Sequence, residues 1–270
     1  MKSLTLVPIG GLANRFYAIT SAIAFCKDYN IKLRVIWFKD KGMGANFHSL
    51  FELAEDVDKS IIEIIDAKWY HYVYDRPRKR NLWLFKFLQS VLFDTCLYEK
   101  DIESSNTILN NIRNHSYVIA WFPFYPQKNN LKYLKPIPSI QKVIDMALLK
   151  IGKDIVGMHI RRTDNSLSIS NSPTSLFIEK MKFEILQDPK VRFYVASDSV
   201  EVKKELSDFF EQRMISLDVN VERSSEVGII DALVELYILS STKKIYGSYA
   251  STYSTLAAEL GGKNIAILSL

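Results

Sequence analysis

The regular alternation of short apolar segments with helical ones in the second half of the chain limits the possible folds most. Apolar runs lie at 155–160, 191–196, 244–246 and 265–268, and helical spacing is found at 172–187, 200–210, 227–239 and 251–260. The apolar runs are nearly continuous, which is typical of strands that are covered on both faces. The alternation predicts a doubly wound parallel sheet, whose ligands bind at the carboxyl ends of the strands.

The start of the chain shows the same order of elements. An apolar run at 4–8 is broken by Gly10-Gly11 and followed by helical spacing over 14–27 and a second apolar run at 33–38. Residues 66–125 are rich in aromatic side chains without a clear period. Prolines lie at 123, 126, 136 and 138, at the end of this stretch and beyond it. A chain of 270 residues can hold two small α/β domains, so we expect a boundary near these prolines, between 135 and 136.

Composition and charge argue against several classes of protein. The chain has 35 basic and 30 acidic residues, a net charge of +5, which favours anionic ligands but is far from the basic stripe of a nucleic-acid-binding protein. Cys26 and Cys96 lie far apart, which argues against a disulfide framework or a zinc site and favours a reducing compartment. No apolar stretch is long enough for a signal-peptide core or a membrane span. We therefore expect a soluble cytoplasmic protein that does not bind nucleic acid.

Polar residues follow the first predicted strand, where a ligand of such a sheet would bind. This junction, Gly10 to Arg15, reads GGLANR. Its glycines let the backbone approach a ligand closely, and the helix that begins behind them favours anions. The motif is neither a dinucleotide fingerprint nor a P-loop, and a tight turn before a helix is the alternative interpretation.

A second junction, HIRRTD, covers residues 159–164. Strand geometry places His159 and Arg161 on one face and Arg162 on the other. The planar donor fork of arginine suits phosphate oxygens, and Asp164 could orient one of the arginines through an ion pair. A solvated charged loop is the alternative, but the neighbouring histidine and the position at the mouth of the sheet favour ligand binding.

Two further junctions and one helix carry polar residues that need an explanation. Asp198 ends the strand at 191–196 and either contacts a ligand or caps the next helix. Ser251 and Thr252 place hydroxyl groups and backbone amides at a helix start, which makes an anion site, unless they serve only as a cap. Asp231 lies on an otherwise apolar helical face, where a carboxylate needs a partner such as the adjacent N–H donors of a guanine edge.

Taken in this order and spacing, the motifs GGLANR, HIRRTD, YVASDS, IIDALVELYILSS and SYASTYSTLAAE resemble the fucosyltransferase superfamily, which includes α1,2-, α1,6-, Nod-factor and protein O-fucosyltransferases. The resemblance covers residues 4–27 and about 154–260 and is strongest to the α1,6 and Nod-factor branch. It implies a GT-B-like α/β fold of two Rossmann-like domains with parallel sheets facing across a cleft. Residues 1–135 would form the acceptor side, and 136–270 would bind the nucleotide sugar.

The resemblance also implies an activity and a set of site residues. The activity is inverting transfer of fucose from GDP-fucose to a glycan or glycoconjugate acceptor, without a metal or another cofactor. Arg161 is the expected catalytic residue, because it would grip the β-phosphate. The expected donor-binding residues are Gly11, Asn14, Arg15, His159, Arg162, Asp198, Asp231, Ser251 and Thr252.

Individual roles follow by position within the family's motifs. His159 and Asp231 would hold the guanine, and Asp198 would lie near the base or ribose. Ser251 and Thr252 would contact the diphosphate, while Asn14 and Arg15 would face the sugar-phosphate from the first domain. The chain departs from the family at Ala13, where a glycine is usual, and at Asp198-Ser199, where two aspartates are usual.

Other functions remain open on the sequence alone. A metal-dependent transferase needs a D-x-D pair at a strand end, but Asp56-Val57-Asp58 follows the helix-like segment 50–55 and is interpreted as a solvated loop. Asp40, His48 and Glu52 are candidates for a general base, and nothing distinguishes them. The alternatives are the same fold with another nucleotide sugar, a non-catalytic nucleotide-sugar-binding protein, and a nicotinamide-dependent oxidoreductase, which the missing glycine fingerprint disfavours.

One segment of the first half combines basic and aromatic residues. Arg76, Arg78, Lys79 and Arg80 precede the apolar run 82–88, and further apolar residues follow to 93. A basic cluster beside an amphipathic helix can lie on a membrane surface, so residues 76–93 are a candidate for peripheral contact with the inner face of a membrane. The alternative is that this helix packs into the core.

Overall fold

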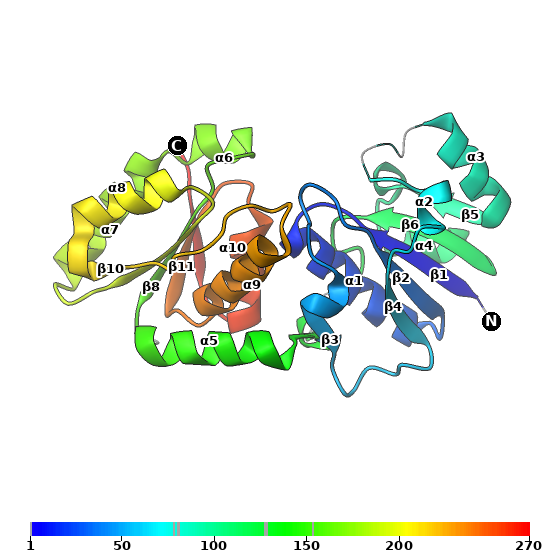
Figure 1. Ribbon diagram of the computed structural model, residues 1–270, viewed down its shortest axis with the longest axis horizontal. Coiled ribbons are helices and arrows are strands. Elements are labelled where there is room, and N and C mark those ends of the chain that lie inside the picture. The colour runs from blue at the N-terminus through cyan, green and yellow to red at the C-terminus, as the bar shows by residue number, and fades with distance from the viewer. Residues whose placement is uncertain (1, 78, 80–81, 127–128, 153) are drawn as a thin grey trace. The chain divides into compact units, whose positions relative to one another are not determined.

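The computed structural model describes residues 2–77, 79, 82–126, 129–152 and 154–270, and the chain divides into two compact units (Figure 1). Unit 1 comprises Met1–Ile137 and Arg223–Glu226, and unit 2 comprises Pro138–Glu222 and Val227–Leu270. The boundary that the prolines suggest falls at the end of strand β7, Leu134–Pro136, just before this division. Each unit has a parallel five-stranded sheet of its own.

Unit 1 is built on a sheet of order β4-β2-β1-β6-β5. Its strands are β1 (Ser3–Pro8), β2 (Lys32–Trp37), β4 (Ile62–Asp66), β5 (Thr95–Leu97) and β6 (His115–Ala120), and its α-helices are α1 (Leu12–Asp28), α2 (His71–Tyr74), α3 (Trp83–Leu92) and α4 (Ser105–Asn111). Short 3-10 helices lie at η1 (Phe47–Ser49), η2 (Glu99–Asp101) and η3 (Asn130–Tyr133). The predicted strand–turn–helix–strand unit at the start of the chain is confirmed by β1, α1 and β2.

One prediction for unit 1 is wrong. The segment 50–55, expected to be helix-like, contains strand β3 (Phe51–Leu53), which pairs antiparallel with β7. Its partner lies far along the chain, so a run this short carries no local signal for the pairing. Asp56 and Asp58 follow in an exposed loop as expected, and Oδ1 of Asp58 accepts a hydrogen bond from the backbone N–H of Ser60 at 2.8 Å.

Unit 2 is built on a sheet of order β10-β9-β8-β11-β12. Its strands are β8 (Val156–Ile160), β9 (Phe193–Ser197), β10 (Met214–Ile215), β11 (Lys244–Ser248) and β12 (Ile265–Leu268). Its helices are α5 (Pro138–Ile151), α6 (Ser166–Asn171), α7 (Thr174–Gln187), α8 (Val200–Phe210), η4 (Glu211–Arg213), α9 (Glu226–Ser240) and α10 (Thr252–Gly261). The predicted alternation of strands and helices is confirmed, and the α/β class with two parallel sheets holds for the whole chain.

The core of unit 2 lies between the sheet and helices α7 and α8. Met158 of β8, Phe193 of β9, Phe177 of α7 and Leu206 of α8 are completely buried. Burying one such side chain stabilises a protein by roughly 1.5–3 kcal/mol. Helices α9 and α10 lie on the other face of the sheet (Figure 1), which explains why the strand sequences are apolar at successive positions.

The start of helix α7 differs from the prediction. Ser172 was expected to be the N-cap with Pro173 at the first helical position, but the helix begins at Thr174 and Pro173 occupies the cap position. The Ser172 hydroxyl instead donates to the carbonyl oxygen of Leu268 at 2.5 Å and accepts from the N–H of Tyr249 at 2.8 Å. The short helix α6, which the sequence analysis missed, fills the chain between β8 and α7.

Chain order fixes where each sheet can bind a ligand. In unit 2 the chain passes from β8 to β9 and β10 on one side, then returns to β11 on the other side of β8. In unit 1 it passes from β1 to β2 and β4, and β6 then pairs with the other side of β1. Ligands of open α/β sheets bind at such switch points, outside the carboxyl ends of the strands. The critical loops are therefore those after β8 and β11 in unit 2 and after β1 and β6 in unit 1.

Burial of His71 in unit 1 makes the stability of the protein depend on pH. The side chain is 4 % exposed, and Nδ1 accepts a hydrogen bond from the N–H of Lys68 at 2.9 Å. Desolvation lowers the pKa of His71 below its ordinary value of 6.5. As the pH falls below 6.5, the unfolded chain takes up a proton before the folded one, so the free energy of unfolding decreases until the folded pKa is passed.

We expect His71→Asn, which keeps a hydrogen-bond acceptor but does not titrate, to remove this part of the pH dependence. Urea unfolding of wild type and variant at about pH 7.5 and about pH 5.5 measures it. The matched control is His115→Asn, at an exposed position of β6, which should leave the wild-type dependence in place. Equal loss of stability with acid in wild type and His71→Asn would contradict this role of burial.

Candidate nucleotide-binding site

The loop after β8 is fixed by its two neighbouring strands. The N–H of Arg161 donates to the hydroxyl of Ser248, at the end of β11, at 3.1 Å. On the β9 side, Oδ1 of Asp198 accepts from the N–H of Arg162 at 2.7 Å, and Oδ2 accepts from the Thr163 hydroxyl at 2.7 Å. Residues 161–163 are thus held in place at the switch point before any ligand arrives.

These bonds decide between the two readings of Asp198. The cap of helix α8 is Ser199, whose hydroxyl accepts from the N–H of Val202 at 3.3 Å. Interpreting Asp198 as the helix cap is therefore wrong. Asp198 fixes the backbone of the β8 loop, and contact with the base or ribose stays a prediction.

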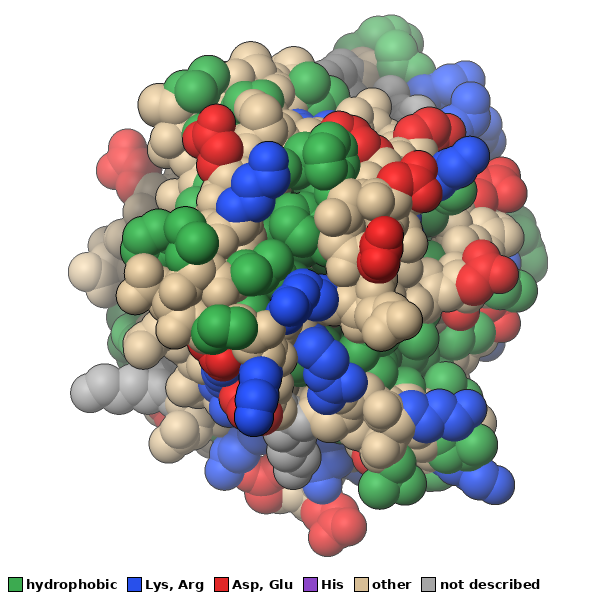
Figure 2. Space-filling model, turned by 90° about the vertical axis from the view of Figure 1, so that its left-hand side faces the viewer, with side chains coloured by type: hydrophobic (Ala, Val, Ile, Leu, Met, Phe, Trp, Pro, Cys, Tyr) green, Lys and Arg blue, Asp and Glu red, His purple; other side chains and the backbone are tan. Residues whose placement is uncertain are grey.

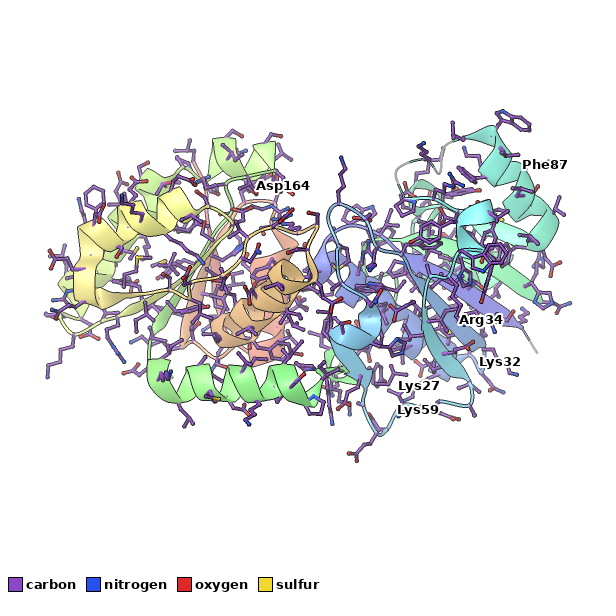
Figure 3. All side chains as sticks on the ribbon, viewed as in Figure 1. Lys27, Lys32, Arg34, Lys59, Phe87 and Asp164 are labelled. Atoms are coloured by element: carbon purple, nitrogen blue, oxygen red, sulfur yellow. The ribbon has the colours of Figure 1, made fainter. Side chains whose placement is uncertain are left out.

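Arg161 occupies the position expected of a phosphate ligand, at the carboxyl end of the central strand. Its Nε and Nη2 lie 3.0 and 2.8 Å from Oδ1 of Asp164, so the expected ion pair is present. The Arg161 side chain is 21 % exposed and that of Asp164 is 50 % exposed (Asp164 is labelled in Figure 3). The pair orients a permanently charged guanidinium at the rim of the sheet while leaving it in reach of a ligand.

Arg162 has a different environment. Its Nε donates to the Thr174 hydroxyl at 3.1 Å, Nη1 to the carbonyl oxygen of Arg161 at 3.2 Å, and Nη2 to the carbonyl oxygen of Ser172. Desolvation lowers the pKa of Arg162, and the nearby Asp198 counteracts this shift. The side chain therefore supports the turn between α6 and α7, and its expected role in donor binding stays a prediction.

The loop after β11 leads into helix α10 and contains a buried polar atom. Ser251 occupies the N-cap position, but its side chain makes no capping hydrogen bond. Its Oγ is buried and has no hydrogen-bond partner among the described residues. A hydroxyl left in this state costs about 1–3 kcal/mol, which a ligand bound at the helix N-terminus would recover. Thr252 is exposed and begins the helix.

Two side chains from the α6 region hold the same loop. Nδ2 of Asn165 donates to the carbonyl oxygen of Ala250 at 2.9 Å, and the Ser168 hydroxyl donates to that of Tyr249 at 2.6 Å. Ala250 has a left-handed backbone with φ of 52°, which is uncommon for a residue with a side chain. The sequence analysis missed both Asn165 and Ser168, because neither has a motif that sets it apart from ordinary loop residues.

His159 is buried in unit 2, and Asp231 is half-buried on α9. The His159 ring is 7 % exposed and stacks on Tyr253 with ring centroids 4.7 Å apart. Asp231 found a partner as expected, but within the protein: its Oδ2 accepts from the N–H of Asn220 at 2.8 Å. Whether either residue also contacts a guanine stays a prediction.

A buried ion pair close to this region was not predicted. Nζ of Lys203 in α8 lies 2.8 Å from Oε1 of Glu235 in α9, with side chains 10 % and 8 % exposed. Burial raises the pKa of Glu235 to about 7, against the opposing effect of Lys203. Glu235 lies one turn after Asp231 in the mostly apolar helix α9, and this is a sequence signal that could have revealed the pair.

In unit 1, the loop after β1 requires one of its two glycines. Gly10 has φ of 84°, and a Cβ there would lie 2.8 Å from Nδ2 of Asn14. Gly11 is the N-cap residue of α1, and a Cβ there would meet no atom within 4 Å. The turn interpretation therefore explains Gly10, whereas Gly11 and Asn14, in the first turn of α1, remain candidates for ligand contact.

Arg15 is held by partners within unit 1, and its expected role at the sugar-phosphate stays a prediction. The side chain is 1 % exposed and donates within unit 1 to the carbonyl oxygens of Gly10 at 2.9 Å and Phe38 at 2.5 Å. Its Nη2 forms an ion pair with Asp40 at 2.8 Å, and the guanidinium lies 4.7 Å from the centre of the Trp37 ring. Arg15 is thus enclosed and ties the β1 loop to the end of β2, because its position in the first turn of α1 points it into the unit.

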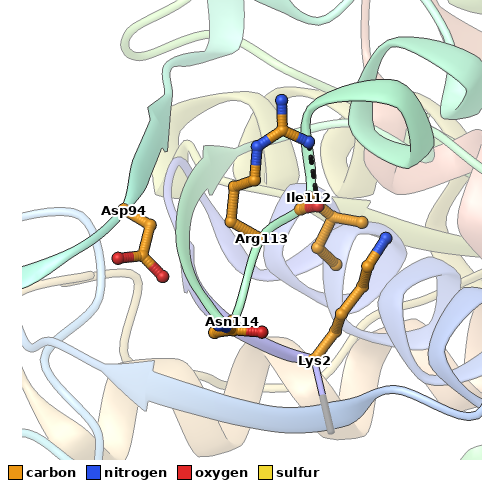
Figure 4. A pocket seen from close by; sticks show the side chains of 5 residues that line it. All are labelled: Lys2, Asp94, Ile112, Arg113 and Asn114. Carbon is orange, nitrogen blue, oxygen red and sulfur yellow. Dashed lines mark hydrogen bonds between the residues drawn. The ribbon is translucent and has the colours of Figure 1, made fainter.

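A pocket of about 360 Å³ lies elsewhere in unit 1 (Figure 4). It is lined by Lys2, Asp94, Ile112, Arg113 and Asn114. Three of these residues directly precede β1, β5 and β6, so the pocket lies at the amino ends of the strands. It is therefore at the opposite edge of the sheet from the switch point, and we do not assign the nucleotide to it.

Removing Arg15 should destabilise the fold. We expect Arg15→Met to lower the free energy of unfolding by about 3 kcal/mol, because Asp40 and two carbonyl groups lose their partner. The control is Arg34→Met, since Arg34 and Glu63 form an exposed pair at 2.8 Å whose loss should cost less than about 1 kcal/mol. Denaturant unfolding measures both, and equal stability of Arg15→Met and wild type would contradict the structural role.

Comparison with solved structures identifies the fold. NodZ α-1,6-fucosyltransferase co-crystallised with GDP matches with a TM-score of 0.62 and 15 % identity, covering 95 % of this chain and 91 % of that one. A mutant of Arabidopsis thaliana FUT1 in complex with GDP matches with a TM-score of 0.62 and 17 % identity over 99 % and 70 % of the two chains. POFUT1 in complex with GDP-fucose matches with a TM-score of 0.57 and 13 % identity over 99 % and 97 %.

No protein-family model matches the sequence. No curated protein sequence matches it either. Among the described residues, no group of three or more His, Cys, Asp or Glu side chains could hold a metal ion. The matches to solved structures concern the three-dimensional fold, which extends over nearly the whole chain: it is the GT-B-like fold of two Rossmann-like sheets found in these fucosyltransferases.

Proposed function

We propose that this chain is an inverting, metal-independent glycosyltransferase that transfers fucose from GDP-fucose to a glycan or glycoconjugate acceptor. The fold supports this proposal, because the structures that share it include fucosyltransferases in complex with GDP and GDP-fucose. The observation that carries it is the placement of Arg161 at the carboxyl end of β8, beside the switch point of unit 2, with Asp164 orienting its guanidinium.

In this proposal unit 2 binds the nucleotide sugar. The diphosphate lies at the N-terminus of α10, where Ser251 and Thr252 meet it and the buried Ser251 hydroxyl gains a partner. Arg161 contacts the β-phosphate, and His159 and Asp231 hold the guanine, with Asp198 near the base or ribose. Arg162 contributes by keeping the α6–α7 turn in place.

Unit 1 is the proposed acceptor side, and Gly11, Asn14 and Arg15 are its proposed contacts with the sugar-phosphate. Asp40 was one candidate for the general base, but its ion pair with the buried Arg15 makes it a structural residue. His48 is paired with Asp66, Nδ1 to Oδ2 at 2.7 Å, and its side chain is 60 % exposed. We place the enzyme in the cytoplasm, because two cysteines that lie far apart in the sequence are typical of a reducing compartment.

The proposed mechanism is electrostatic. As the bond between the sugar and the β-phosphate breaks, the sugar becomes oxocarbenium-like and negative charge grows on the departing GDP. A guanidinium held at that phosphate stabilises the transition state more than the ground state, which accelerates the step. An acceptor hydroxyl attacks the anomeric carbon from the face opposite the departing GDP and gives up its proton to a general base or to water. The new C–O bond forms as the bond to the β-phosphate breaks, so the configuration inverts.

The donor can be tested directly. We expect the purified protein to bind GDP, to hydrolyse or transfer from GDP-fucose, and to use GDP-mannose and UDP-sugars far more slowly. Calorimetry with each nucleotide and detection of released GDP measure binding and turnover separately. Turnover with another nucleotide sugar alone would reassign the donor. The assay is also run with mixtures of glycan acceptors. If the protein binds GDP but turns over no donor even then, the catalytic proposal is rejected in favour of a nucleotide-sugar-binding protein.

Arg161 gives the sharpest prediction. Arg161→Ala should lower kcat by about 10²–10³-fold, because the α10 N-terminus and its hydroxyl groups cannot replace the full positive charge of the guanidinium at the leaving phosphate. Arg161→Lys should recover little, since an ammonium group cannot reproduce the guanidinium fork. Asp164→Asn, which weakens the orientation but keeps Arg161, should give an intermediate loss of kcat.

The matched control is Arg192→Ala, at an exposed arginine by the amino end of β9 in the same unit. It should retain wild-type kcat and thermal stability. The readout is steady-state release of GDP from GDP-fucose, with folding checked by the unfolding midpoint. A well-folded Arg161→Ala enzyme with wild-type kcat would remove Arg161 from the mechanism.

A further inference from the structure

Helix α3 of unit 1 is attached to the fold along one side only. Its buried residues are Phe85 and Gln89. The Gln89 side chain is held at both ends, because Nε2 donates to the carbonyl oxygen of Tyr74 at 2.9 Å and Oε1 accepts from the Tyr98 hydroxyl at 2.8 Å. These contacts fix which face of α3 is turned away from the unit.

The outward face of α3 is apolar. It consists of Trp83, Leu84, Phe87 and Val91, which are 76 %, 46 %, 57 % and 68 % exposed, and we call it the α3 face. Their spacing places them along one side of the helix, opposite Phe85 and Gln89. Figure 3 shows Phe87 on the outer side of the helix. Trp69 lies just before the neighbouring helix α2 and is 79 % exposed. Val73 lies within α2 and is 53 % exposed.

The segment that carries the α3 face has charge of one sign. Residues 76–93 contain the basic residues Arg76, Arg78, Lys79, Arg80 and Lys86 and no Asp or Glu. Arg78 and Arg80 lie outside the described residues. Arg76 is anchored at the base of the helix, donating from Nε to the carbonyl oxygen of Tyr72 at 2.9 Å, and Lys79 and Lys86 are exposed.

On α7 and α8 of unit 2, exposed apolar side chains are mixed with acidic ones. Phe183, Leu186 and Phe209 on α7 and α8 are exposed, but Glu179, Glu205 and Asp208 are exposed on the same two helices. Figure 2 views this end of the molecule and shows acidic, basic and apolar side chains interspersed. The combination of an apolar stripe with a segment, 76–93, that has basic but no acidic residues sets the α3 face apart from α7 and α8.

We propose that the α3 face, together with the exposed Lys79 and Lys86, docks this protein onto a bilayer that contains anionic phospholipid. Exposed aromatic side chains partition into the boundary between headgroups and acyl chains, and nearby Lys and Arg side chains are attracted to anionic headgroups. The contact is peripheral, because no helix among the described residues is long and apolar enough to cross a bilayer.

Charge also favours lipid over a second copy of the chain as the occupant. A symmetric dimer through the α3 face would bring two basic segments against each other, since the same patch faces itself across a two-fold axis. An anionic membrane surface is complementary to the apolar stripe and the positive charge alike. The proposal concerns unit 1 alone and does not depend on the assignment of the nucleotide site.

Co-sedimentation with vesicles tests the proposal. Wild type should bind vesicles of mixed phosphatidylglycerol and phosphatidylcholine, more weakly as salt is raised, and should bind pure phosphatidylcholine poorly. The double variant Trp83→Ser, Phe87→Ser should bind the mixed vesicles at least about tenfold more weakly, because two exposed aromatic anchors are lost. Lys79→Gln with Lys86→Gln should lower affinity for the mixed vesicles and remove part of the salt dependence.

The matched control is Leu149→Ser with Leu186→Ser, at apolar side chains of unit 2 that are 86 % and 78 % exposed. It should bind the mixed vesicles as wild type does. The proposal is overturned if wild type binds neither vesicle, if anionic lipid makes no difference, or if both α3 variants bind normally. A change in oligomeric state of the Trp83, Phe87 variant with unchanged vesicle binding would assign the face to self-association and equally overturn it.

Discussion

The end of strand β8 is the constraint on which the candidate site depends. Its loop is held from both sides, by the Asp198 carboxylate after β9 and by the Ser248 hydroxyl at the end of β11. Both partners come from strands that pair with β8 in parallel register, so their carboxyl ends reach the same edge of the sheet. The backbone position of Arg161 is therefore set by the sheet. Asp164 then orients the Arg161 side chain through the ion pair. In the proposed function, a charge placed this rigidly would need little reorganisation when a phosphate binds.

Buried charged groups connect elements in both units. Arg15 and Asp40 link the loop after β1 to the residues after β2, and Lys203 and Glu235 link α8 to α9. Ion pairs of this kind contribute little net stability over apolar packing, but losing one partner strands a buried charge and is costly. They therefore act more as constraints on geometry than as sources of stability. In unit 1 this constraint fixes the glycine loop. In unit 2 it fixes α8, which follows Asp198, to α9, which contains Asp231.

Much of the fold could be predicted because its signals are local. Strand and helix segments of unit 2 follow from runs of apolar residues and their spacing, and β12 and α8 have the expected bounds. The environment of Arg15 could not be predicted, because its partners Phe38 and Asp40 come together with it only through the pairing of β1 and β2. The same holds for Asp198, whose bonds cross from one strand end to the next. The sequence motifs located the loops correctly. Which of their residues hold the backbone in place became clear only from the hydrogen bonds of the structure.

The left-handed Ala250 and its neighbour Tyr249 are restrained by side chains of Asn165 and Ser168, which belong to the segment leading into and through α6. These hydrogen bonds therefore join the loop before α10 to the segment after β8. Because of them, a shift of one segment is expected to move the other. A substitution at Asn165 or Ser168 is therefore expected to displace the start of α10 as well as the segment that carries the substituted residue. In the proposed function, such a change would alter how the site fits the departing nucleotide.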